Sequence, residues 1–228
     1  MKNGISTKVL AVAPHPDDET FGCGGSLLRH KAAGDEVHWL ICTEMTAGNG
    51  YSDEQRQKRD KEIESVARAY GFASVQKLGF PTTKLDTVPL SELVARMSEA
   101  FKNVQPNAVY LPYRGDVHSD HAITFDAAAA CCKSFRFPSI KRVMCYETLS
   151  ETEFGINPDA NGFRPQVFIS IAEHLDRKIE ILKIYESELS AFPFPRSEEC
   201  VRSLAALRGS SSGSQAAEAF LLSKEIID

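Results

Sequence analysis

Short apolar runs alternate with longer segments of helical periodicity through most of the chain. The runs are rich in β-branched and aliphatic residues and predict buried strands over 9–13, 37–42, 75–78, 108–112, 142–147 and 166–171. The segments between and after them carry apolar residues at helical spacing and predict helices over 20–33, 52–70, 90–103, 120–133 and 172–190. The tail is expected to be irregular, because prolines interrupt it at 192–195 and a mobile loop is expected over 209–213.

Strands that alternate with helices predict an α/β fold with a doubly wound sheet. The crossover helices imply a mostly parallel sheet with helices on both faces. No internal repeat or linker divides the 228 residues, so residues 1–228 are expected to form a single domain. Sheets of this kind place ligands at the carboxyl ends of their strands, which is where candidate functional residues are sought.

Two polar segments, 14–19 and 116–121, directly follow predicted parallel strands. A hydrolytic zinc site needs three nitrogen or oxygen ligands from the protein and an open position for water. His15, Asp18 and His121 supply such a set, and the neighbouring Asp17 is then free to accept a proton from the water as general base. Either segment alone is more typical of solvated surface residues, but the two together favour a metal site.

The second segment also offers a group that stabilises a developing oxyanion. His118 precedes His121 by one helical turn, so both side chains are expected to face the same way. A protonated His118 would stand beside the oxyanion, with Asp120 holding it in place. The proton for the departing amine would come from Asp17 or from His118.

The motif Ala13-Pro14-His15-Pro16-Asp17-Asp18-Glu19, with His118-Ser119-Asp120-His121 downstream, resembles the PIG-L or LmbE-like deacetylases. The likeness extends over most of the chain. It implies a Rossmann-like domain that binds one zinc ion through the residues matching His15, Asp18 and His121. It also implies that Asp17 is the general base and that His118, with Asp120 behind it, stabilises the oxyanion.

The resemblance further implies a substrate-binding arginine on the second predicted helix. Arg59 is the expected counterpart, with Arg56 as the alternative. Many family members carry a glycine–glutamate pair after the second strand, where this chain has 46–50 (Thr-Ala-Gly-Asn-Gly), and this departure leaves the substrate open. Glu44 and Arg114, on loops near the expected site, are further candidates for substrate contact, although solvated loop residues are about as common.

Two glycine-containing stretches suggest other chemistry and are assigned structural roles. Residues 22–25 (Gly-Cys-Gly-Gly) lack the full dinucleotide-binding spacing, so close packing is expected there. Residues 209–213 match the nucleophile-elbow pattern but follow a helix instead of a strand, so a loop is expected.

Charge and cysteine usage narrow the possible partners. A net charge of −5 argues against nucleic acid as a partner. No apolar stretch is long enough to span a bilayer, and the first residues form too short an apolar run for a secretory signal. The six cysteines form no CxxC pair. We therefore expect free thiols, a cytoplasmic location and no integral membrane contact, and we leave a homo-oligomer open.

The expected function is zinc-dependent removal of an acetyl group from an N-acetylglucosamine-type sugar or a small-molecule conjugate of it. Fe²⁺ or another divalent ion remains an alternative to Zn²⁺. One competing interpretation is a metal-dependent amidase that acts on a thiol conjugate or an antibiotic intermediate. Another is a non-catalytic sugar- or nucleotide-binding module, in which the acidic residues only stabilise the fold.

Overall fold

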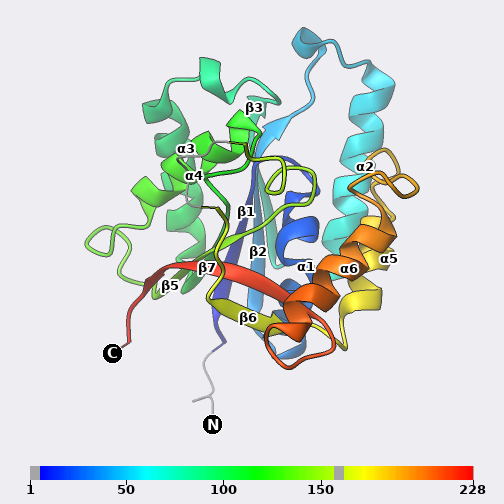
Figure 1. The fold of residues 1–228 in the computed structure, drawn as a ribbon. Helices are drawn as coiled ribbons and strands as arrows, with labels where there is room; N and C mark the ends of the chain where they lie inside the picture. Colours follow the sequence, from blue (N-terminus) through cyan, green and yellow to red (C-terminus); the bar gives the residue numbers. More distant parts are fainter. Residues whose placement is uncertain (1–5, 157–161, 228) are drawn as a thin grey trace.

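The computed structural model describes residues 6–156 and 162–227, and a seven-stranded sheet forms its centre in the order β3-β2-β1-β4-β5-β7-β6 (Figure 1). The first five strands are parallel, while β7 runs antiparallel to both β5 and β6. Their bounds are β1 Lys8–Ala13, β2 Glu36–Glu44, β3 Ser74–Pro81, β4 Ala108–Pro112, β5 Arg142–Tyr146, β6 Val167–Ser170 and β7 Ala217–Glu225. The predicted α/β class with a mostly parallel, doubly wound sheet is confirmed.

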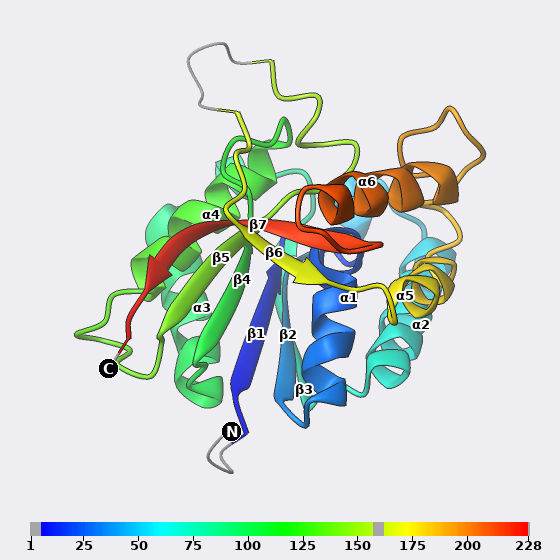
Figure 2. The ribbon, with the colours of Figure 1, turned by 60° about the horizontal axis from the view of Figure 1, so that its bottom comes forward.

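Helices cover both faces of the sheet, as expected (Figures 1 and 2). On one side α3 and α4 pack against alternate strand residues such as Leu10 and Val109, and on the other side α1, α2 and α5 pack against Trp39 and Tyr110. The α-helices are α1 Asp18–Ala32, α2 Asp53–Tyr70, α3 Leu90–Val104, α4 Ser119–Cys131, α5 Leu175–Leu182 and α6 Glu198–Ser210, with short 3₁₀ turns η1 Ala47–Asn49 and η2 Leu85–Thr87.

The tail of the chain is more regular than its sequence predicts. The expected helix over 172–190 is reduced to α5. Ile184 and Tyr185 make tight i to i+3 turns, and the buried Tyr185 ring belongs to the core on the face of the sheet that α1, α2 and α5 cover. The expected irregular tail instead contains α6, whose amino end is capped by Ser197, and the strand β7. The first two residues of the expected loop over 209–213 lie in α6, and a turn follows them.

Close packing explains the glycines at the start of α1. A Cβ atom on Gly22 would lie 2.1 Å from Cδ2 of Tyr146, and one on Gly25 would lie 2.7 Å from Ile171. Tyr146 and Ile171 belong to the far half of the chain, so the glycines let α1 approach it closely. This agrees with the packing role expected for residues 22–25 and not with a phosphate-binding loop.

Two further expectations concern membranes and thiols. No described helix is both long enough and apolar enough to cross a bilayer. All six cysteines are free thiols, and five of them are buried. The very start of the chain, for which no secretory signal was expected, lies partly outside the described residues.

Candidate metal and catalytic site

Three side chains from two distant segments meet where β1 and β4 end. β1 and β4 are parallel neighbours, so their following loops leave the same edge of the sheet. His15 lies in the loop after β1, Asp18 begins α1, and His121 lies in the first turn of α4. Asp18 Oδ2 lies 3.2 Å from His15 Nδ1 and 3.4 Å from His121 Nε2, and the potential ligand atoms of all three residues lie within 4.8 Å of one another.

Unsatisfied polar atoms in this group indicate what it is built to hold. Asp18 and His121 are completely buried, yet Asp18 Oδ1 and His121 Nε2 have no hydrogen-bond partner within the described residues. Such orphaned atoms are costly in a protein interior. Two imidazoles and one carboxylate are also a donor set that divalent transition metals bind. The three residues therefore fit a metal ion.

A second carboxylate orients His121 for this role. His121 Nδ1 lies 2.8 Å from Asp116 Oδ2, and the Thr152 hydroxyl donates a 2.6 Å hydrogen bond to Asp116 Oδ1. A carboxylate behind a histidine fixes the ring so that its other nitrogen faces the metal. Asp116 belongs to the second polar segment, but the sequence assigned it no role.

The carboxylates give the cluster a negative potential. Burial alone lowers the pKa of His15, but hydrogen bonds to Asp120 and Asp18 outweigh it and raise the pKa to about 9. Burial likewise lowers the pKa of His121, and the Asp18 charge with the Asp116 hydrogen bond raises it to about 10. Both shifts show that the site favours a positive charge between these side chains.

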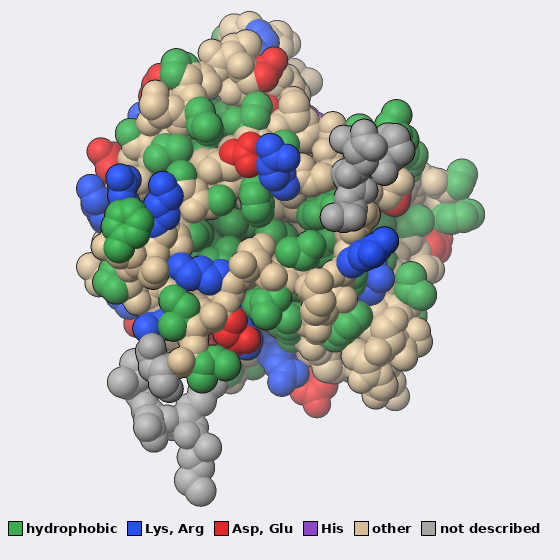
Figure 3. Space-filling model, turned by 60° about the vertical axis from the view of Figure 1, so that its left-hand side comes forward, with side chains coloured by type: hydrophobic (Ala, Val, Ile, Leu, Met, Phe, Trp, Pro, Cys, Tyr) green, Lys and Arg blue, Asp and Glu red, His purple; other side chains and the backbone are tan. Residues whose placement is uncertain are grey.

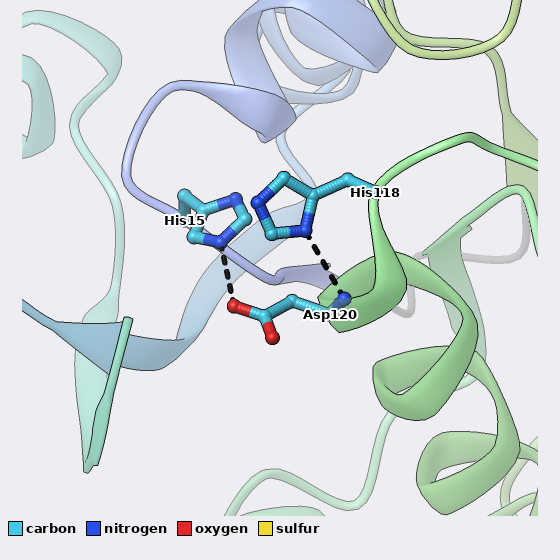
Figure 4. A group of neighbouring side chains, drawn as sticks. All are labelled: His15, His118 and Asp120. Carbon is cyan, nitrogen blue, oxygen red and sulfur yellow. Dashed lines mark hydrogen bonds and ion pairs between the residues drawn. The ribbon is translucent and has the colours of Figure 1, made fainter. Parts of the chain in front are cut away.

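His118 and Asp120 also lie beside His15 (Figure 4). The His15 and His118 rings are 4.6 Å apart between centroids, and His118 Nδ1 accepts a 3.1 Å hydrogen bond from the Asp120 backbone N–H. The Asp120 carboxylate contacts His15 Nε2 at 2.9 Å, and the backbone N–H groups of Thr83 and Leu85 donate to it. Asp120 therefore supports the His15 ring directly and holds His118 only through its own backbone, unlike the expected contact between the two side chains.

Asp17 is buried beside this cluster in an unusual backbone conformation. Its φ is 138°, a region that residues with a side chain rarely adopt, and its backbone N–H donates to Glu19. Burial raises the pKa of Asp17 to about 7, against the opposing charge of Arg196, whose Nη1 donates a 2.8 Å hydrogen bond to Asp17 Oδ2. Arg196 comes from the proline-rich tail and was missed, because no local motif connects it with Asp17.

A cavity of about 270 Å³ opens onto His15 and Asp17. Its walls include Glu44 and both candidate arginines of α2, Arg56 and Arg59. Arg59 is buried and donates to the Pro16 carbonyl at 3.0 Å and to Glu188, so the protein itself occupies much of its hydrogen-bonding capacity.

The two remaining arginine candidates differ in their surroundings. Arg56 pairs with the exposed Asp53, and its Nε is buried without a partner among the described residues. Arg114 does not line this cavity, because its exposed side chain makes a two-pronged ion pair with Asp126 on α4, at 2.7 and 3.1 Å. The structure thus brings Glu44, Arg56 and Arg59 to the candidate site and leaves Arg114 outside it.

Comparison with known proteins places this arrangement in a family. The model of the PIG-L family, described as GlcNAc-PI de-N-acetylase, matches residues 10–132, which include every candidate metal ligand. The chain belongs to this family. The resemblance found in its two motifs is therefore confirmed.

Several relatives with similar sequences are named as deacetylases. An uncharacterized deacetylase, YaiS, of Escherichia coli is 28% identical over 78% of this chain and 90% of its own length. The diacetylchitobiose deacetylase of Thermococcus kodakarensis is 26% identical over 92% of this chain and 81% of its own. The solved N,N'-diacetylchitobiose deacetylase of Pyrococcus horikoshii shares the fold, with a TM-score of 0.76 and 22% identity over 96% and 84% of the two chains. The expected enzyme class, an N-deacetylase, is confirmed.

Proposed function

We propose that this PIG-L member removes the acetyl group from an N-acetylglucosamine-type sugar or sugar conjugate, with a divalent ion held by His15, Asp18 and His121. The observation that carries the proposal is the pair of orphaned buried atoms, Asp18 Oδ1 and His121 Nε2, next to a cavity that also exposes Asp17. Zn²⁺ suits the mixed nitrogen and oxygen donors, and Fe²⁺ is the alternative. A binding module has no need of such a costly arrangement.

A bound divalent ion supplies Lewis-acid chemistry, which activates water and polarises the acyl carbonyl. The chain supplies the proton transfers. Asp17 takes a proton from the attacking water as the water oxygen adds to the carbonyl carbon. A pKa of about 7 suits a base that works near neutral pH. When the carbon–nitrogen bond breaks, Asp17 returns a proton to the departing amine.

His118 is assigned to the oxyanion. Because Nδ1 accepts a hydrogen bond from the Asp120 backbone, the ring proton resides on Nε2. In this tautomer a neutral His118 donates through Nε2, so the role does not require the protonated ring that the sequence suggested. Burial, together with the nearby His15, lowers the pKa of His118 to about 4, which also favours the neutral ring.

The cavity walls are proposed to recognise the sugar. Glu44 accepts hydrogen bonds from hydroxyl groups, and Arg59 donates to them with the N–H groups that its protein partners leave free.

We further propose a cytoplasmic enzyme that acts on a small molecule and whose residues 1–228 form one domain. On the face that carries α3 and α4, side chains of both charges surround a hollow of hydrophobic groups (Figure 3). This visible face therefore offers no continuous basic surface for a nucleic acid.

The test is acetate release from a panel of N-acetylated sugars, their conjugates and acetylated antibiotic intermediates. Zinc-loaded wild type is compared with Asp17→Asn, which keeps the shape of the side chain but removes the base. We expect Asp17→Asn to retain the metal and to lose about 10²–10⁴-fold in turnover. Full turnover by Asp17→Asn would contradict the assignment of the base.

The panel also separates the competing functions. Release from acetylated antibiotic intermediates or thiol conjugates alone would move the substrate class and keep the chemistry. Absence of both acetate release and bound metal, in protein with a cooperative unfolding transition, would favour the binding module. The metal is measured in the same samples by elemental analysis, with Fe²⁺ loading as a parallel arm.

A further inference from the structure

The segment that follows α5 brings Arg196 back onto the candidate base. Arg196 lies 179 residues from Asp17 in the sequence, yet its Nη1 donates to Asp17 Oδ2 at 2.8 Å. The same nitrogen donates to Glu188 Oε2 at 3.1 Å, and Nε donates to the Ser150 hydroxyl at 2.8 Å. The contact therefore joins three separate loops at one wall of the cavity.

Burial distinguishes this contact from an ordinary surface ion pair. The Arg196 side chain is 14% exposed, and its guanidinium lies over the Phe21 ring at 5.2 Å from the centroid. Surface ion pairs contribute little because both side chains remain solvated and mobile. Here the guanidinium is held by an aromatic face and by several acceptors from different segments, so its position is determined independently of Asp17.

The geometry at Asp17 shows what this rigid guanidinium does. Arg196 donates to Oδ2, and none of the hydrogen bonds found among the described residues ends on Oδ1. A carboxylate held by one oxygen presents the other in a fixed direction. The backbone of Asp17, at a φ of 138°, is equally constrained, so the main chain and the arginine together define where Oδ1 points.

We propose that Arg196 is a positioning residue for the deacetylation, which holds Asp17 Oδ2 so that Oδ1 receives the proton of the attacking water. The inference rests on the proposed function. Glu188 takes part because it contacts both Arg196 and Arg59, and it thereby connects the base to the wall that faces the sugar. Loss of Arg196 should therefore lower kcat more than it raises KM.

The experiment compares Arg196→Gln and Arg196→Lys with a matched control, Arg208→Gln. Arg208 is also a partly buried arginine, 20% exposed, but its carboxylate partner is Glu147 and it does not line the cavity. We expect Arg196→Gln to lose about 10²-fold in kcat, the scale of a small misplacement of a reacting group, with KM changed far less. Arg196→Lys should recover part of the loss, and Arg208→Gln should keep the wild-type kcat.

A double-mutant cycle tests whether Arg196 acts through Asp17. In the Asp17→Asn background, Arg196→Gln should cause little further loss, because its target is already disabled. Full additivity of the two losses would overturn the inference. So would an unchanged kcat of Arg196→Gln, or equal losses in Arg196→Gln and Arg208→Gln.

A crystal structure of zinc-loaded Arg196→Gln tests the inference without any substrate. The Asp17 carboxylate is expected to leave its wild-type orientation, and a carboxylate that superimposes on the wild type would overturn the positioning role while leaving the proposed function intact. Conversely, a wild type that releases no acetate would contradict the proposed function whatever Asp17 does in the crystal. The two failures are thus distinguishable.

Discussion

Two clusters of buried charge lie along α1, and they are satisfied to very different degrees. At the bend of the helix, where Cys23 leaves helical geometry, Glu218 accepts hydrogen bonds from the N–H groups of Gly25 and Ser26 at 2.8 and 2.7 Å. Lys178 completes the network, because its Nζ donates to Glu218 and to the Phe21 carbonyl at 2.8 Å each. Backbone N–H groups and the opposite charge of Lys178 thus satisfy the Glu218 carboxylate, and we call this group the closed cluster.

The cluster of Asp18 and His121 at the amino end of the same helix contains buried atoms without a hydrogen-bond partner, and we call it the open cluster. Asp18 is buried even more deeply than Glu218, but its Oδ1 and the Nε2 atom of His121 have no hydrogen-bond partner within the described part of the chain. A closed network stabilises the bend, whereas an open one costs free energy until a ligand completes it. Burial alone therefore does not separate the two clusters, and what distinguishes the metal site is that its unsatisfied atoms, Asp18 Oδ1 and His121 Nε2, are of the types that bind metals.

The largest expected effect is on metal binding by the open cluster. His121→Ala removes one of the three proposed ligands, so we expect the affinity for zinc to fall by more than the ~10–100-fold typical of losing an outer partner. A competition titration with a chelator measures it. His174→Ala, which alters a histidine at the start of α5, serves as the control and should bind zinc like the wild type. Equal zinc affinity in the two variants would remove His121 from the ligand set.

The closed cluster should respond in stability instead. Lys178→Met leaves Glu218 buried without its counter-charge, which typically costs about 3–5 kcal/mol in the free energy of unfolding. Urea denaturation measures this loss, and the zinc affinity of the folded protein should not change. The double variant Lys178→Met/Glu218→Gln is the control, because it removes the uncompensated charge and should recover part of the stability. A loss of zinc affinity in Lys178→Met would show that the two clusters are coupled.

Asp116 tests whether the support behind a ligand matters. Asp116→Asn weakens the contact that orients His121, and we expect zinc affinity to fall by about 10–100-fold. Asp126→Asn, which changes the partner of Arg114, is the matched control on a neighbouring surface. An affinity of Asp116→Asn equal to that of this control would show that packing alone orients His121.

The sequence predicted the parts of the molecule that depend on local pattern. Strands β1, β2, β4 and β5 each contain an apolar run, and the motif around His15 can be recognised from residues that are close in the chain. Asp120, in contrast, was placed behind His118, although its carboxylate contacts His15. That contact depends on the meeting of two loops, which spacing within one segment does not reveal.

Longer-range features escaped the sequence for the same reason. Arg196 reaches Asp17 across 179 residues, and β7 enters the sheet between β5 and β6 only after α6 has crossed over. The helix expected over 172–190 ends early, because Tyr185 is drawn into the core and its hydroxyl donates to Glu19 at 3.0 Å. In each case a tertiary contact overrides the local preference of the segment.

The smallest expected effect concerns Arg114, the sequence candidate that the structure leaves outside the cavity. Its ion pair with Asp126 joins two solvated side chains, 61% and 37% exposed, and pairs of this kind contribute about 0–1 kcal/mol. Arg114→Ala should therefore leave KM for the acetylated sugar unchanged within about twofold, and zinc affinity should match the wild type. Arg59→Ala, in a residue that lines the cavity and contacts Glu188, provides the contrast and should raise KM. If Arg114→Ala raised KM as much as Arg59→Ala, the bound substrate would have to extend beyond the cavity to the loop after β4. The substrate-binding surface would then extend further from the open cluster than the cavity indicates.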